Sequence, residues 1–216
     1  VIEVGHKRDV PIVMDAALTI PPVENLRKWV EMGVDVACYC GGKSICGPND
    51  IGFNVGHEDL LKLAACHRFP YHGLGRGMKI DKTEMVALTK ALQMYPKTVE
   101  DDMKGAYKVA KWLAEELSKL PHVKSLEQKI GEMGALRPWP YLCLKLEEDS
   151  LEMKTQDIVN LLYDGEPCIW TYAPDSFYCL GGVGINCQTL YYGTRRFPGD
   201  ERIVLKRFKE ILMKKR

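Results

Sequence analysis

The chain has 216 residues, of which 46% are hydrophobic, so it can bury the core of one domain or of one and a half domains. Its 30 Lys and Arg nearly balance 29 Asp and Glu, and a formal charge of +1 provides no field that favours nucleic acid or a membrane surface. No apolar stretch approaches the roughly 20 residues that span a bilayer, and no charged-then-apolar leader stands at the start.

The first hundred residues alternate between strand and helix signals. Residues 1–7 resemble the last turn of a helix that closes on Gly5. The apolar runs at 11–14, 34–39 and 51–56 predict strands, and helical spacing predicts helices at 21–32, 57–66 and about 81–94. This alternation predicts an α/β domain over residues 1–97.

The remainder of the chain follows a different pattern. Pro96 and the polar residues 98–102 are typical of the start of a helix, and the amphipathic pattern runs to about residue 120, before Pro121. We expect this 98–120 helix to link two domains. The signals beyond it predict strands at 123–130, 141–146, 167–172 and 177–180, and helices at 155–163 and 199–213. Residues 121–216 are therefore predicted to form a small α+β domain.

Eight cysteines are scattered along the chain, and no two form a Cys-x-x-Cys pair. Cys38, Cys143, Cys168 and Cys179 lie in apolar runs, which is typical of reduced, buried thiols in a cytosolic protein. We therefore predict free thiols and a cytoplasmic location.

Two charged residues follow neighbouring predicted strands. Asp15 ends the first strand, and Lys43 lies just after the second. In open α/β sheets ligands bind at the carboxyl ends of strands, so these two side chains can face one small molecule. The pair suits pyridoxal phosphate, which needs a lysine to form a Schiff base and an acid to keep its pyridine nitrogen protonated.

Other readings of these residues remain open. An aspartate after a strand is commonly a turn or cap residue, and most lysines are solvated. Residues 42–44 also resemble the end of a phosphate-binding P-loop. That alternative fails because Ala37 stands where the P-loop needs glycine, and because residues 47–48 turn the chain where it needs a helix.

Four ordered runs of the sequence resemble the fold-type I pyridoxal phosphate enzymes grouped with bacterial selenocysteine synthase and D-glucosaminate-6-phosphate ammonia-lyase. The runs are residues 12–17; residues 41–48, followed by Gly52 and Gly56; residues 75–79, followed by 82–84; and residues 186–190, followed by 199–201. Together they extend over nearly the whole chain. Residues 41–43 and 75–79 resemble the ammonia-lyase more than the selenium transferase.

The resemblance implies the carboxyl-terminal half of a fold-type I large domain followed by a small α+β domain. It implies that Lys43 forms the Schiff base and can take the α-proton of the substrate, and that Asp15 pairs with the pyridine nitrogen. Ala17 or Ala16 would lie against one face of the ring, and Gly42 would contact the cofactor. A lysine reacts in this way only as the free amine, which a dry site favours.

The resemblance also implies a substrate site. Arg76 and Lys79 match basic positions near the family's active site, where they would hold a carboxylate or phosphate. A phosphorylated amino sugar acid suits both, and a basic rim on a flexible loop is the alternative. The implied reaction is an α,β-elimination with ammonia release from a compound such as D-glucosaminate 6-phosphate.

Three further expectations follow from the family. A selenium transferase, with a tRNA partner, is one alternative function, and a non-catalytic structural or partner-binding remnant is another. Enzymes of this kind are generally dimers or larger, so we expect a homo-oligomer. The glycine- and serine-rich turn that binds the cofactor phosphate in fold-type I enzymes is not matched here, so we expect the chain alone to bind pyridoxal phosphate poorly.

Some residues depart from the family pattern or point to other chemistry. Cys187 stands where relatives usually show proline, and Cys46 where they usually show a basic residue, which would weaken anion binding. His67 and His72 have no cysteine or acidic partner at ligand spacing, so no metal site is predicted.

Overall fold

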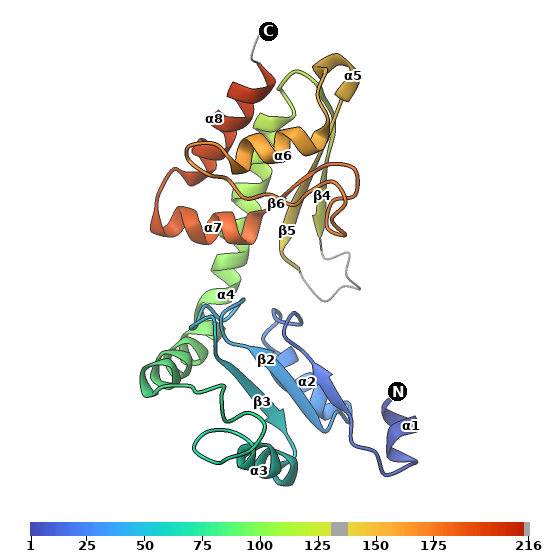
Figure 1. The fold of residues 1–216 in the computed structure, drawn as a ribbon, viewed down its shortest axis with the longest axis vertical. Coiled ribbons are helices and arrows are strands. Elements are labelled where there is room, and N and C mark those ends of the chain that lie inside the picture. The colour runs from blue at the N-terminus through green and yellow to red at the C-terminus, as the bar shows by residue number, and fades with distance from the viewer. Residues whose placement is uncertain (131–137, 214–216) are drawn as a thin grey trace. The chain divides into compact units, whose positions relative to one another are not determined.

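The computed structural model describes residues 1–130 and 138–213. The chain divides into two compact units, Val1–Glu100 and Asp101–Arg216. Helix α4 (Lys82–Leu117) contributes residues to both (Figure 1).

The N-terminal unit is built on a three-stranded sheet in the order β1-β2-β3. Strand β1 (Val13–Asp15) is parallel to β2 (Val36–Cys40), which is antiparallel to β3 (Gly52–Gly56). The predicted strands are thus confirmed, apart from small shifts in their ends.

Three short helices complete the N-terminal unit. Helix α2 (Asn25–Glu31) lies on one face of the sheet (Figure 1), where the Tyr39 hydroxyl on β2 donates to the Asn25 carbonyl at 2.6 Å. Helix α3 (Glu58–Cys66) follows β3, as predicted. Helix α1 (Ile2–His6) runs through Gly5 rather than closing on it.

The predicted break at Pro96 is wrong, because α4 runs through this proline without interruption. A proline inside a helix removes one hydrogen bond and crowds the preceding turn. The flanking Tyr95 and Val99 are each only 3% exposed, so the apolar face of the helix continues past the exposed proline. Burial of that face offsets the local loss.

The C-terminal unit contains an antiparallel sheet in the order β4-β5-β6. Its strands are β4 (Val123–Ile130), β5 (Pro140–Leu146) and β6 (Val183–Asn186). Its helices, besides part of α4, are α5 (Glu148–Leu151), α6 (Thr155–Tyr163), α7 (Cys187–Arg196) and α8 (Asp200–Leu212). The core joins buried residues of α4, α6 and α8 to Leu142 and Leu144 of β5 and Val183 of β6.

The third strand of the C-terminal sheet is β6, at a position where the sequence did not predict a strand. Residues 167–172 and 177–180 are not strands, apart from an isolated bridge between Tyr172 and Gly184, and α7 was not predicted. Glycine has low strand propensity, which hid β6. A Cβ atom on Gly184 would lie 2.8 Å from the Cβ of Tyr172, so this strand position needs glycine to pack so closely.

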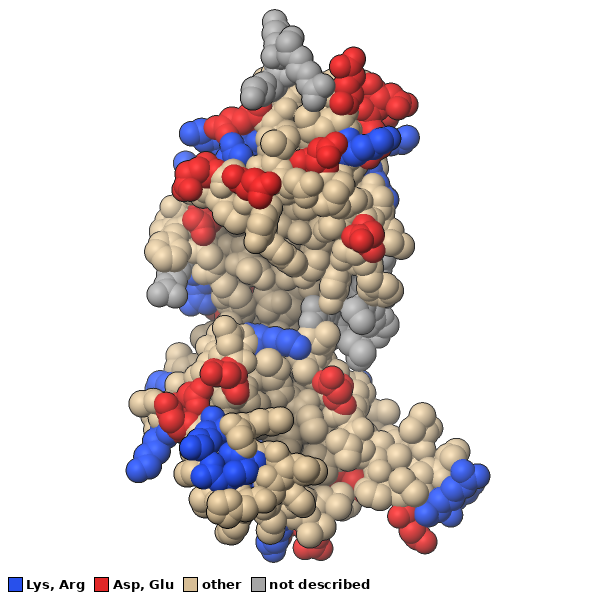
Figure 2. Space-filling view, in the orientation of Figure 1, with Lys and Arg blue, Asp and Glu red and all other residues tan. Residues whose placement is uncertain are grey.

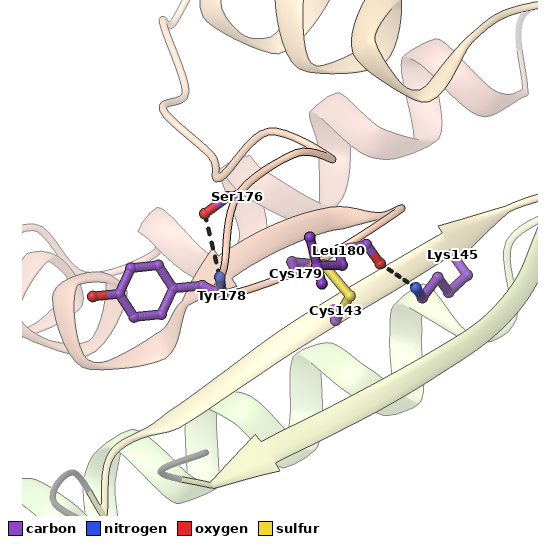
Figure 3. Close-up of a disulfide and its surroundings, with 6 residues drawn as sticks. All are labelled: Cys143, Lys145, Ser176, Tyr178, Cys179 and Leu180. Carbon is purple, nitrogen blue, oxygen red and sulfur yellow. Dashed lines mark hydrogen bonds between the residues drawn. A yellow bond between two sulfur atoms is a disulfide. The ribbon is translucent and has the colours of Figure 1, made fainter. Parts of the chain in front are cut away.

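A disulfide joins β5 to the segment before β6 (Figure 3). Cys143 and Cys179 have Cα atoms 5.4 Å apart, and the Lys145 side chain donates to the Leu180 carbonyl beside them (Figure 3). The prediction that all cysteines are free is therefore wrong for this pair. The two residues are 36 positions apart, and only the pairing of β5 with β6 brings them together.

Acidic and basic side chains are interspersed over the face drawn in Figure 2, in keeping with the near balance of charges in the sequence. In the described part of the chain, no helix has both the length and the apolar composition that a bilayer crossing requires.

Candidate functional site

Asp15 lies at the carboxyl end of β1, where the backbone turns away from the sheet. The next residue still donates to β2, from the Ala16 amide to the Cys38 carbonyl at 2.8 Å. The Asp15 carboxylate is exposed and accepts the Ala17 amide at 3.0 Å. Asp15 is the register partner of Cys38 on β2, and burial, followed by the negative charge of Asp15, raises the pKa of the Cys38 thiol.

Lys43 lies in a compact loop between β2 and β3. The loop is closed by backbone hydrogen bonds from Gly41 to Ile51 at 2.9 Å and from Gly47 to Gly41 at 2.8 Å. Lys43 accepts the Cys46 amide through its carbonyl at 3.0 Å, while its side chain is exposed. The residues that the structure describes therefore do not form the dry pocket expected around this amine.

Gly41 and Gly42 let this loop fold tightly. A Cβ on Gly42 would lie 2.5 Å from the Asn49 Cα, and one on Gly41 would lie 2.7 Å from the Ile51 carbonyl oxygen. Turns follow Ser44 where a P-loop would begin a helix, so the rejection of the P-loop is confirmed.

The Lys43 loop is joined to the segment that follows Asp15. The buried hydroxyl of Ser44 donates to the Ile20 carbonyl at 2.9 Å. Thr19 fixes the same segment, because its hydroxyl donates to the Ala16 carbonyl at 3.0 Å and it accepts the Trp29 indole N–H at 3.0 Å. The structural roles of Ser44 and Thr19 could not be predicted from the sequence, because an isolated hydroxyl residue in a loop forms no recognisable pattern.

Arg76 and Lys79 come together at an aromatic ring in the loop between α3 and α4. The Arg76 guanidinium carbon lies 4.8 Å from the centroid of the Phe69 ring, and the Lys79 ammonium lies 5.8 Å from it. Arg76 is half-buried, and its Nε has no hydrogen-bond partner among the residues described. Lys79 is exposed. The contacts that hold these cations involve Phe69, not Lys43 or Asp15.

The two cysteines that depart from the family pattern differ in environment. Cys187, at the start of α7, is fully buried, and its burial raises the pKa of the thiol to about 12. Cys46 is exposed in the Lys43 loop, with a positive φ of 58°. In the described ranges, no three His, Cys, Asp or Glu side chains are placed to hold a metal ion.

The chain is similar to several proteins that are named as enzymes. No protein-family model matches the chain. It is 27% identical over 214 residues to a 5'-C-glycyluridine monooxygenase-decarboxylase of Streptomyces sp, covering 98% of this chain and 49% of that protein. It is 36% identical over 94 residues to the D-glucosaminate-6-phosphate ammonia lyase of Salmonella typhimurium, covering 44% and 23% of the two chains.

A third relative extends over most of the chain. The L-seryl-tRNA(Sec) selenium transferase of Caldanaerobacter subterraneus is 24% identical over 233 residues, covering 97% of this chain and 47% of that protein. The chain spans about half the length of the curated relatives that it matches from end to end.

The chain also resembles solved structures of enzymes. The structure of D-glucosaminate-6-phosphate ammonia-lyase matches with a TM-score of 0.70 and 26% identity, covering 98% of this chain and 52% of that one. A ureidoglycine-glyoxylate aminotransferase from Bacillus subtilis matches with a TM-score of 0.61, 17% identity and coverage of 98% and 55%. That second likeness concerns the fold alone.

These findings define the class of protein. The chain has the α/β fold of the fold-type I pyridoxal phosphate-dependent enzymes, over about half the length of such an enzyme. It is homologous to D-glucosaminate-6-phosphate ammonia-lyase and to L-seryl-tRNA(Sec) selenium transferase. The predicted resemblance and the predicted cofactor class are thereby confirmed.

Proposed function

We propose that Lys43 and Asp15 hold pyridoxal phosphate in this chain. Both side chains follow adjacent parallel strands at their carboxyl ends, and the Ser44 to Ile20 hydrogen bond ties their loops together. Neither side chain has an ion-pair partner in the part of the chain described, so a charged ligand can engage both. An amine and a carboxylate have the chemistry to bind an aldehyde and a basic ring nitrogen, respectively.

In this arrangement each residue has its own task. Pyridoxal phosphate, when bound, supplies an electron sink for a carbanion next to an amine. The Asp15 carboxylate would keep the ring nitrogen protonated, and the half-buried Ala17 would lie against the ring. Gly42 would let the loop backbone approach. The Lys43 amine would carry the cofactor and, when released by a substrate amine, would take the α-proton.

The proposed reaction is elimination from an amino sugar acid such as D-glucosaminate 6-phosphate. The substrate would lose its α-hydrogen and β-hydroxyl as water, and hydrolysis would then release ammonia and leave a keto acid. We propose that Arg76 and Lys79 bind the carboxylate or phosphate of this substrate. Their joint position at Phe69 supports an anion site, because it brings two cationic side chains to the same ring.

A second candidate is supported by the length of the match with the glycyluridine enzyme, which extends over 98% of the chain. Its name describes an oxygenation with decarboxylation, so this reaction would consume oxygen. The selenium transferase relatives support a transferase reading, in which a tRNA would be a partner. In all three readings we propose a cytoplasmic homo-oligomer.

Cofactor attachment can be mapped directly. Because the chain alone is expected to bind pyridoxal phosphate poorly, it is incubated with an excess of the cofactor. It is then reduced with borohydride and digested, and the modified lysine is located by mass spectrometry. Lys43 is expected to carry the adduct, and Asp15→Asn should weaken its formation about tenfold or more, since a charged partner is lost. Lys62→Ala is the matched control, because Lys62 is an exposed lysine on α3. Modification spread evenly over exposed lysines would contradict the proposal.

The reaction type can then be assigned by its products. Elimination from D-glucosaminate 6-phosphate releases ammonia without oxygen uptake, whereas a monooxygenase consumes oxygen. Arg76→Ala is expected to raise KM for the phosphorylated acid about tenfold or more. If Lys43 carries the cofactor but oxygen is consumed and no ammonia appears, the lyase assignment is wrong and the second candidate holds.

A further inference from the structure

The C-terminal unit contains a cavity of about 570 Å³, and none of the residues that line it belongs to the N-terminal unit. It is lined by residues 167–172, the end of β6, and parts of α7 and α8. We call it the small-domain cavity. Its volume lies within the range of small-molecule sites in proteins, and its walls include the apolar side chains of Ile185, Leu190 and Ile203.

One full charge faces this apolar surface. Among the described residues that line the cavity, only Asp200 has a side chain that is charged at neutral pH. It is half-buried, and no residue that the structure describes pairs with its carboxylate. A Cβ on Gly193 would lie 2.8 Å from its Oδ2, so the glycine on α7 leaves room for the carboxylate at this position.

A second polar group in the lining also lacks a partner. Thr171 is 7% exposed, and its hydroxyl forms no hydrogen bond with the described residues. Buried polar atoms in native proteins are nearly always paired, so this hydroxyl, which is itself shielded from solvent, points to an ordered water behind the lining.

Aromatic rings complete the lining. Trp170 and Tyr172 pack edge to face with ring centroids 4.9 Å apart, and Trp170 remains 64% exposed. The face of an indole ring attracts organic cations, and a carboxylate adds an ion pair to that attraction. An acid at the start of α8 also suits the helix dipole, but this role does not explain the cavity.

We propose that the small-domain cavity binds a small organic monocation, an ammonium group on an apolar body. The ammonium pairs with Asp200, and the apolar body lies against Trp170 and Ile203. Every lining residue belongs to the C-terminal unit, so the proposal can be tested without pyridoxal phosphate.

Cys168 provides a readout within the cavity, because it is an exposed free thiol among the lining residues. The cofactor-free chain is alkylated with and without benzylammonium, and each cysteine is quantified by mass spectrometry. Benzylammonium is expected to protect Cys168 saturably. Cys66, an exposed thiol of the N-terminal unit, serves as the internal control and should stay unprotected.

The charge is tested by matched ligands and variants. Benzyl alcohol has nearly the same shape without the charge and should need roughly three to ten times the concentration, the ratio that one ion pair provides. Asp200→Asn should remove this difference, and Gly193→Ala should weaken binding of the cation by displacing the carboxylate. Asp164→Asn, at an exposed acid outside the lining, should behave as the unaltered chain. Circular dichroism checks that each variant is folded.

Equal protection by benzyl alcohol and benzylammonium would overturn the proposal, as would undiminished protection by the cation in Asp200→Asn. The absence of protection by either compound would overturn it as well. Equal protection of Cys66 would show that benzylammonium slows alkylation without binding in the cavity, and this result would also overturn the proposal.

Discussion

The hydroxyl of Ser44 donates to the carbonyl of Ile20 at 2.9 Å, and this bond joins the loop that carries Lys43 to the segment that follows Asp15. The two residues are 24 positions apart, and both are buried. In the proposed site the spacing between amine and carboxylate depends on how firmly these two loops are held together.

Removal of this hydroxyl should loosen the site. Ser44→Ala is expected to lower the free energy of unfolding by about 1 kcal/mol, because a buried carbonyl loses a donor. Urea denaturation measures this change, and the affinity for pyridoxal phosphate should fall in parallel. The control is Ser118→Ala, since Ser118 donates to a carbonyl on an exposed part of the chain. Equal effects of the two variants would contradict a special role for Ser44.

The conformation of the loop that carries Arg76 should depend on Gly73 and not on Gly77. A Cβ on Gly73 would lie 2.3 Å from the Cα of His67, whereas one on Gly77 would meet nothing within 4 Å. We expect Gly73→Ala to destabilise the loop by about 1 to 3 kcal/mol and Gly77→Ala to be neutral or slightly stabilising.

Limited proteolysis between residues 67 and 80, together with urea denaturation, measures both glycine variants. Gly73→Ala should be cleaved faster than the unaltered chain. If Gly77→Ala is cleaved as fast as Gly73→Ala, the close packing of Gly73 on His67 does not determine the loop conformation.

Glu148 should stabilise the C-terminal unit near neutral pH, and this contribution should be lost in acid. This carboxylate accepts the Thr155 amide at 2.7 Å and the Lys154 ammonium at 3.1 Å. The hydrogen bonds from Thr155, and then the one from Lys154, lower the pKa of Glu148 from 4.5 to about 2. Because the folded-state value is the lower one, its stabilising contribution is present above pH 4.5 and is lost as the pH falls towards 2.

Glu148→Gln should therefore be less stable than the unaltered chain above pH 4.5, and the two should converge in stronger acid. Urea denaturation across this range measures the difference. Glu115→Gln, at an exposed position on α4, is the control and should follow the unaltered chain throughout. A difference for Glu148→Gln that stays constant with pH would contradict the assigned contacts.

The rate at which each cysteine reacts with an alkylating reagent should depend on its exposure and on whether its thiol is free. Cys46, Cys66 and Cys168 are exposed and free, so alkylation of the native chain should reach them first. Cys187 should react only after unfolding, because burial both blocks access and raises the pKa of its thiol to about 12. Cys143 and Cys179 should require reduction as well. Alkylation of these two in the unreduced native chain would show that the disulfide is absent.

The sequence alone predicted the N-terminal sheet well, because each strand there is a short apolar run between turn residues. The strand predicted at residues 11–14 is β1, which begins two positions later and ends one position later, and the helix predicted at residues 155–163 is α6. The errors lie where tertiary contacts outweigh local preference. Pro96 is tolerated inside α4 because the buried residues on either side continue the apolar face.

The sequence by itself determined the chemistry that this protein can offer: an aspartate and a lysine after successive strands, in an order shared with pyridoxal phosphate enzymes. Only the tertiary structure decided which residues hold those groups in place. The Ser44 hydrogen bond, the Cys143–Cys179 disulfide and the small-domain cavity all bring together positions that are distant in sequence. Local patterns report a residue's own preferences, whereas hydrogen bonds and buried charges depend on neighbours that folding supplies.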